Sequence, residues 1–169
     1  MIDDGSGSTQ YSLTLQLLAL MTVLTLLPSL LLMMTSFVRI IIVMSLLRQA
    51  LGTAQPPPKQ VLLGLALFLT IFIMMPVLSS VYDEAVTPYF NEDIGFEEAV
   101  EVAREPFRTF MLNQTRESDI ALFVEIAGNT EVVEPADVPF STLVPAFITS
   151  ELKSAFSIGF LIYIPFVVI

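Results

Sequence analysis

An apolar run from Leu13 to Leu47 opens the chain, and its only charged residue is Arg39. As one helix this run would extend roughly 52 Å at ~1.5 Å per residue, whereas the hydrocarbon core of a bilayer is about 30 Å thick. A simple membrane anchor ends after ~20 apolar residues and does not carry an arginine well inside its apolar length. The run therefore predicts a segment that has protein neighbours along most of its length.

A second apolar run, Val61 to Tyr82, contains no charge and is long enough for one tilted membrane crossing. Residues 49–60 separate the two runs and include a proline triplet, which cannot continue a helix and forms a stiff turn. The pattern predicts a helical hairpin over residues 13–82, preceded by a flexible tail over residues 1–12. The residues that mark its turn are Arg48, Pro56, Pro57, Pro58 and Lys59.

Residues 83–137 are strongly acidic, with 14 Asp and Glu against three Arg. Within them, apolar residues recur at spacings of three and four from Phe96 to Met111, which predicts an amphipathic helix. We expect Pro106 to kink this helix or to start a new one. Ser118 and Asp119 are candidate caps for a short helix over residues 120–127, closed by Gly128 and Asn129. This region is interpreted as a small helical insert outside the membrane.

A third apolar region covers residues 138–169 and is interrupted by Glu151 and Lys153. We expect a helix to begin at Thr149 and Ser150, with Glu151 in its first turn near the positive end of the helix dipole. Residues two apart on a helix point about 200° apart, so Glu151 and Lys153 cannot meet each other. Each needs its own partner, in this chain or in a neighbouring one.

Arg39, Glu151 and Lys153 are therefore candidate contacts for subunit assembly. For Arg39 the alternative is a side chain that extends to the membrane interface. For Glu151 and Lys153 the alternative is solvation at an interface or a channel wall.

Composition narrows the function. The chain is 54% hydrophobic and 14% charged, with a mean hydropathy of +0.78, which is typical of a membrane protein. It contains no Cys and no His, which excludes His-dependent catalytic triads and the commonest metal ligands. The net charge of −10 argues against nucleic-acid binding. Ser150 and Lys153 match a Ser-x-x-Lys pattern, but such short patterns are common and its companion motifs are absent from the sequence. We expect no catalytic residue, metal or cofactor.

The few basic residues suggest an orientation. Arg48 and Lys59 flank the turn of the hairpin, so the positive-inside rule places residues 49–60 in the cytoplasm. The amino terminus and the acidic insert then lie on the opposite side of the membrane. The first residues lack the basic start of a secretory signal, consistent with a mature form from which a signal was removed.

Several segments resemble the FliP family of flagellar export proteins. They are Leu32 to Val43, Leu47 to Thr53, Pro57 to Thr70, Phe110 to Glu117, and, most specific, Pro145 to Phe156 followed by Ile158 to Phe160 and Ile164 to Phe166. The resemblance covers nearly the whole chain after Tyr11 and extends to the R subunit of virulence type III secretion.

This resemblance implies an all-α, membrane-type fold that is part of a multi-subunit helical pore in the inner membrane, within the flagellar basal body. It implies five copies assembled with FliQ and FliR, with FlhB and FlhA as further partners and unfolded flagellar proteins as substrates. It places the insert in the periplasm. Members of the family continue beyond the position of Ile169 with a further hairpin and a methionine-rich loop, so we expect the chain to be truncated there. The rival interpretation is a subunit of a small-molecule or ion transporter, although the chain shows no internal repeat.

Overall fold

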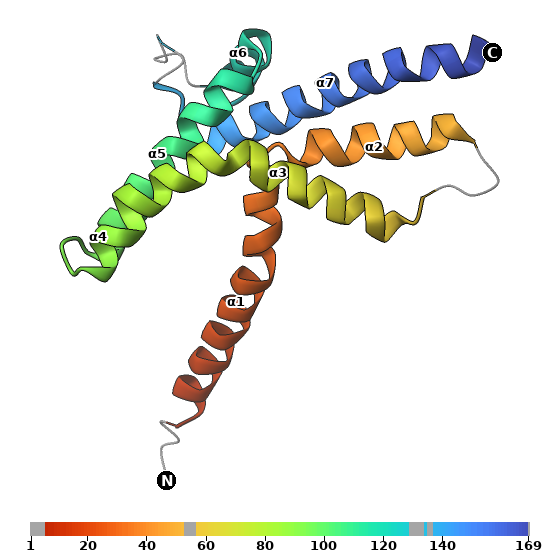
Figure 1. Ribbon diagram of the computed structural model, residues 1–169. Coiled ribbons are helices and arrows are strands. Elements are labelled where there is room, and N and C mark those ends of the chain that lie inside the picture. The colour runs from red at the N-terminus through yellow and green to blue at the C-terminus, as the bar shows by residue number, and fades with distance from the viewer. Residues whose placement is uncertain (1–5, 53–56, 129–133, 135–136, 169) are drawn as a thin grey trace. The chain divides into compact units, whose positions relative to one another are not determined.

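The computed structural model describes residues 6–52, 57–128, 134 and 137–168 (Figure 1). All regular elements in these residues are helical, which confirms the predicted all-α class. In chain order they are α1 (Ser6–Met33), α2 (Phe37–Leu51), α3 (Lys59–Val81), the π-helix η1 (Tyr82–Val86), α4 (Thr87–Phe90), α5 (Phe96–Gln114), α6 (Glu117–Ile126) and α7 (Phe140–Val168).

The first apolar run does not form one long helix. Helix α1 ends at Met33 and α2 begins at Phe37, so three residues separate them, of which Thr35 and Ser36 carry hydroxyl groups. The Thr35 hydroxyl accepts a hydrogen bond from the Phe37 backbone N–H at 3.3 Å. Serine and threonine offer the backbone such alternative partners and so favour helix boundaries. The excess length of the run is resolved by this break.

Helix α1 forms a compact unit of its own, which ends at Leu32. From Leu13 on it is apolar on every side, and its leucines from Leu13 to Leu31 are exposed. The hydroxyls of Thr22, Thr25 and Ser29 donate to carbonyl oxygens one turn earlier in the helix. Each of these three hydroxyls therefore has a hydrogen-bond partner within the helix, as is needed in a helix surrounded by lipid or by other apolar helices.

The second unit begins at Met33 and contains all the other helices. Helix α2 has 15 residues, about 22 Å, which is shorter than a membrane core. It ends at Leu51, and the following Gly52 has a φ of 48°, in the left-handed region that glycine adopts at low cost. Helix α3 starts after Pro58, and α2 and α3 pack against each other. Pro57 lies just before that start, whereas Pro56 lies outside the described residues.

Helix α3 passes Pro76 and continues through the π-helix η1 into α4, so the helical path runs from Lys59 to Phe90. It therefore extends beyond Asp83, where the sequence turns acidic. Its buried residues, Ala66, Thr70 and Met74, are four apart and form one stripe. Most of its other residues are also apolar, and many of them are exposed, among them Phe68, Phe72 and Ile73. In the part of the chain that the structure describes, three helical segments are long and apolar enough to cross a membrane: Ser12–Met33, Lys59–Phe90 and Phe140–Val168.

Helix α5 follows the predicted amphipathic pattern and passes Pro106 without a new helix starting there. Helix α6 begins at Glu117, earlier than the predicted residue 120, and the expectation that Ser118 or Asp119 caps it is wrong because its N-cap is Arg116. After α6, Gly128 adopts a φ of 68°. Asn129 lies outside the described residues.

The expected start of a helix at Thr149 and Ser150 is also wrong. Helix α7 runs unbroken for 29 residues and includes both Pro145 and Pro165, so Glu151 lies in its interior. The reason is packing: Leu143 and Phe147, which flank Pro145, are fully buried. They belong to an apolar core with Met111 of α5, Ile120 of α6 and Val138, and the Phe147 ring meets Phe110 edge-on at 5.9 Å. This core offsets the cost of the proline.

Helix α7 lies alongside α2 (Figure 1). Gly159 of α7 lies close to the Leu46 side chain of α2. A Cβ atom at Gly159 would overlap the Leu46 Cδ1 atom and lie 3.2 Å from the Leu46 Cβ. The Cδ1 atom can move aside, but the Leu46 Cβ is fixed to the α2 backbone. Glycine is therefore needed here for two helices to pack closely.

Gly159→Val should lower the free energy of unfolding of the detergent-solubilised protein by about 1–3 kcal/mol, and with it the melting temperature, because overpacking forces α2 and α7 apart. Adding Leu46→Ala should restore part of the loss. Gly64→Val is the matched control, since a Cβ at Gly64 of α3 meets nothing within 4 Å. Equal melting temperatures for the two valine variants would contradict the close approach.

Candidate functional site

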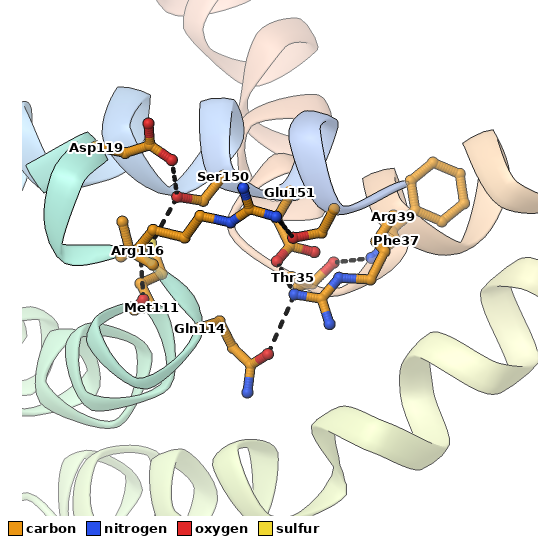
Figure 2. A network of polar contacts seen from close by, with 11 residues as sticks. Thr35, Phe37, Arg39, Met111, Gln114, Arg116, Asp119, Ser150 and Glu151 are labelled. Atoms are coloured by element: carbon orange, nitrogen blue, oxygen red, sulfur yellow. Dashed lines mark hydrogen bonds and ion pairs between the residues drawn. The ribbon is translucent and has the colours of Figure 1, made fainter. Parts of the chain in front are cut away.

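The centre of the second unit holds a buried carboxylate on an apolar helix. The Glu151 side chain in α7 is 1% exposed and forms an ion pair with Arg39 of α2. The same guanidinium donates to the Gln114 side-chain oxygen at 3.2 Å, at the end of α5 (Figure 2). Arg39 thus connects three helices that are far apart in the sequence. A buried carboxylate needs such a partner because desolvation of an unpaired charge costs several kcal/mol.

A second buried carboxylate belongs to helix α6. Asp119, in the first turn of α6, is 1% exposed and accepts hydrogen bonds from Lys153 and from the Ser150 hydroxyl, the latter at 2.6 Å. The Ser150 oxygen accepts the Arg116 backbone N–H at 3.0 Å (Figure 2). The Arg116 guanidinium also donates to the Ser154 hydroxyl at 3.4 Å. These contacts fix the beginning of α6 on α7.

The hydrogen bond from Lys153, with a second from Ser150, holds the pKa of Asp119 below its ordinary value of 3.8. A depressed pKa means that folding favours the ionised carboxylate, so the folded chain is stabilised at pH values above the ordinary pKa. That stabilisation disappears as the pH falls and Asp119 becomes protonated.

The three charges predicted as assembly contacts therefore all have partners in this chain. Glu151 and Lys153 do not meet each other: Glu151 contacts α2 and Lys153 contacts α6. Arg39 is bound to Glu151 rather than extended alone toward a membrane surface. A role of these charges in assembly stays a prediction, and it now concerns how the protomer is shaped before it meets its neighbours.

The sequence predicts Arg39, Glu151 and Lys153 as site residues of this network but not their partners. Gln114, Arg116, Asp119 and Ser150 were not among the predicted site residues as partners of these charges. The pairs that they form join positions more than 30 residues apart, so no local spacing reveals them. The available signal was indirect: two charges inside an apolar segment demand two compensating groups elsewhere.

The arrangement does not support catalysis by the Ser150 hydroxyl. That hydroxyl is fully buried and donates to Asp119, while Lys153 bonds to Asp119 and not to Ser150. A lysine-activated serine nucleophile requires the two side chains to be within hydrogen-bond reach. Among the described residues no group of three His, Cys, Asp or Glu side chains could hold a metal ion.

The other predicted set of residues lies at the connection of α2 and α3. Arg48 and Lys59 both line a cavity of about 710 Å³ between these helices, together with Gln49 and Gln60. None of the residues that line this cavity belongs to the buried network of ion pairs and hydrogen bonds described above. Its apolar part is formed by Ile41, Leu62 and Leu63.

Breaking the central ion pair should destabilise the chain more than removing it altogether. Arg39→Met and Glu151→Met alone should each cost roughly 3 kcal/mol, because each leaves an uncompensated charge, whereas the double variant should cost less than either. Thermal unfolding in detergent measures all three. The exposed Arg104–Glu101 pair at 3.1 Å is the control, and its loss should cost less than about 1 kcal/mol. Additive losses for Arg39 and Glu151 would contradict the pairing.

Stability should also fall below about pH 4, because protonation of Asp119 removes its bond to Lys153. Asp119→Asn should lower the stability at pH 7 and flatten its dependence on pH between pH 5 and 3. Glu125→Gln removes an exposed carboxylate from the same helix and should leave the dependence unchanged. Identical pH profiles for wild type and Asp119→Asn would refute this role of Asp119.

Comparison with known proteins places these features in a family. The FliP family model matches residues 20–169. The flagellar biosynthetic protein FliP of Pectobacterium carotovorum is 57% identical over 164 residues, which are 97% of this chain and 64% of that protein. The FliP proteins of Cereibacter sphaeroides and Bacillus subtilis are 52% and 47% identical over 99% of this chain, and it covers 56% and 76% of their lengths. The chain thus spans less than two thirds of the first two relatives. On the extent of these matches, the chain belongs to the FliP family.

Proposed function

We propose that this chain is a core subunit of the membrane-embedded gate for flagellar protein export. In this proposal several copies, five by resemblance to the family, surround a channel together with FliQ and FliR. FlhB and FlhA act as further partners, and unfolded flagellar proteins pass through the channel. The names of the relatives support a place in flagellar biosynthesis. The role of the chain is structural and not catalytic.

One structural observation carries the proposal: an uneven distribution of apolar surface. Helix α7 buries its first half against α5 and α6, yet Phe156, Phe160 and Leu161 in its second half are 57–67% exposed. Helix α1 from Leu13 to Leu31 and one broad face of α3 expose apolar side chains. A single protomer therefore leaves far more apolar surface open than a monomer in water tolerates. Lipid or neighbouring subunits must cover it.

The buried network favours neighbouring subunits for part of this surface. It fixes α2, α5 and α6 on α7 and gives the protomer a defined shape, which a repeated interface requires. A transporter of small molecules would instead use midplane charges as a binding site open to solvent. Here Glu151 and Asp119 are each 1% exposed and are occupied by partners within the chain.

We also propose an orientation. Residues 49–60, with Arg48 and Lys59 at their borders, lie on the cytoplasmic side, and the acidic region 83–137 lies in the periplasm of the inner membrane, within the flagellar basal body. The positive-inside rule supports this arrangement. In the assembly, the periplasmic region contacts the corresponding region of neighbouring copies.

Purification of the tagged protein from native membranes in mild detergent tests the proposal. We expect a ring-sized complex that contains several copies and two further small membrane proteins identified by mass spectrometry as FliQ and FliR. Replacing both Arg39 and Glu151 with methionine removes the ion pair without leaving an unpaired charge. Purification of this variant tests whether the complex requires the arrangement of helices that the ion pair fixes. A monomer that carries neither partner, in wild-type protein that is folded by circular dichroism, would overturn the export-gate assignment.

A further inference from the structure

The cavity between the end of α2 and the start of α3 has a two-part lining. Arg48, Gln49, Lys59 and Gln60 provide charged and amide groups. Ile41, two helical turns before Arg48, and Leu62 provide apolar surface on the same cavity. With a volume of about 710 Å³, it can hold a group larger than a simple ion.

Within the described residues, the two cations of this cavity, Arg48 and Lys59, have no carboxylate partner. Between Asp4 and Asp83 the sequence contains no Asp or Glu. Of the ion pairs in the described residues, none includes Arg48 or Lys59, whereas Arg39, Arg104, Arg108 and Lys153 all have carboxylate partners. This is unusual in a chain with a net charge of −10. The cavity therefore carries a local positive charge that the chain itself does not neutralise.

The start of α3 adds to this charge. Pro58, at the N-cap, offers no side-chain hydrogen bond, and its carbonyl accepts the backbone N–H groups of Val61 and Leu62. The N–H groups of Lys59 and Gln60 thus lie at the positive end of a helix of 23 residues. A negatively charged group beside Lys59 would be stabilised by this helix end as well as by the two side chains.

We propose that this cavity binds the headgroup of an anionic phospholipid such as phosphatidylglycerol. The phosphate lies between Arg48 and Lys59, the glycerol hydroxyls meet the amides of Gln49 and Gln60, and the acyl chains leave along the apolar lining. The apolar lining favours a lipid over free phosphate, and exposed Leu63 and Leu65 on α3 continue it along the helix. Basic cavities between apolar helices are a recurring form of lipid headgroup site. The proposal requires only that α3 lies in a membrane, so it stands apart from the export role.

Native mass spectrometry of the intact detergent-solubilised protein tests the site. Dioleoyl phosphatidylglycerol is titrated against dioleoyl phosphatidylcholine, which has the same acyl chains and no net charge. The wild type should prefer phosphatidylglycerol, and each of Arg48→Gln and Lys59→Gln should reduce the preference about fivefold. The exchange Arg48→Lys with Lys59→Arg keeps both charges and should keep the preference. Arg104→Gln is the control for a cation outside the cavity.

Inorganic phosphate and added salt complete the experiment. High NaCl should weaken the preference in the unaltered protein, which keeps the test valid if a variant fails to fold. Equal binding of the two lipids by the wild type would overturn the proposal. A preference for phosphatidylglycerol that survives when Arg48→Gln and Lys59→Gln are combined would also overturn it. Displacement of phosphatidylglycerol by an equal concentration of inorganic phosphate would overturn it as well, because it would indicate a site for phosphate and not for a lipid.

Discussion

The compensation of charge inside an apolar helix is the constraint on which this structure depends. Helix α7 carries Glu151 and Lys153 in a segment that is otherwise apolar, and each of them recruits a different helix. Glu151 holds α2 through Arg39, and Lys153 holds α6 through Asp119. A salt bridge of this kind adds little net stability over apolar packing, but removing one partner is costly. The pairs therefore select one arrangement of helices in a surface that apolar contacts alone would leave ambiguous.

Apolar packing then completes the arrangement around α7. The core of Met111, Ile120, Leu143 and Phe147 closes one half of the helix, and Gly159 allows α2 to approach the other half. What remains open is the greater part of α1, one broad face of α3 and the second half of α7. The helices of one protomer are thus held together around the buried charges, while its exposed apolar side chains are left for lipid or other subunits to cover. This division suits a subunit that is formed first and covered afterwards.

The sequence predicts the elements better than their arrangement. Run lengths and the charge pattern anticipated the apolar helices and the amphipathic α5, because these depend on local spacing. The predicted start of α7 at Thr149 and Ser150 is wrong because Leu143 and Phe147 are buried around Pro145. Their tertiary packing outweighs the local preference of these residues for a helix boundary. Asp119 was interpreted as a cap because its role depends on Lys153, which lies 34 residues away. The buried stripe of α3 could not be predicted either, since that helix is apolar on every side.

Whether Arg39 meets the Glu151 of its own chain is the most direct question for this account. The chain contains no cysteine, so Arg39→Cys with Glu151→Cys introduces the only two thiols and removes both charges together. After treatment with a short bismaleimide in native membranes, denaturing electrophoresis separates cross-links within one chain from cross-links between chains. We expect the doubly substituted protein to become an internally linked monomer of altered mobility, while either single cysteine variant stays unlinked. A band at twice the monomer mass, without the linked monomer, would show that these residues pair between subunits and would contradict the account.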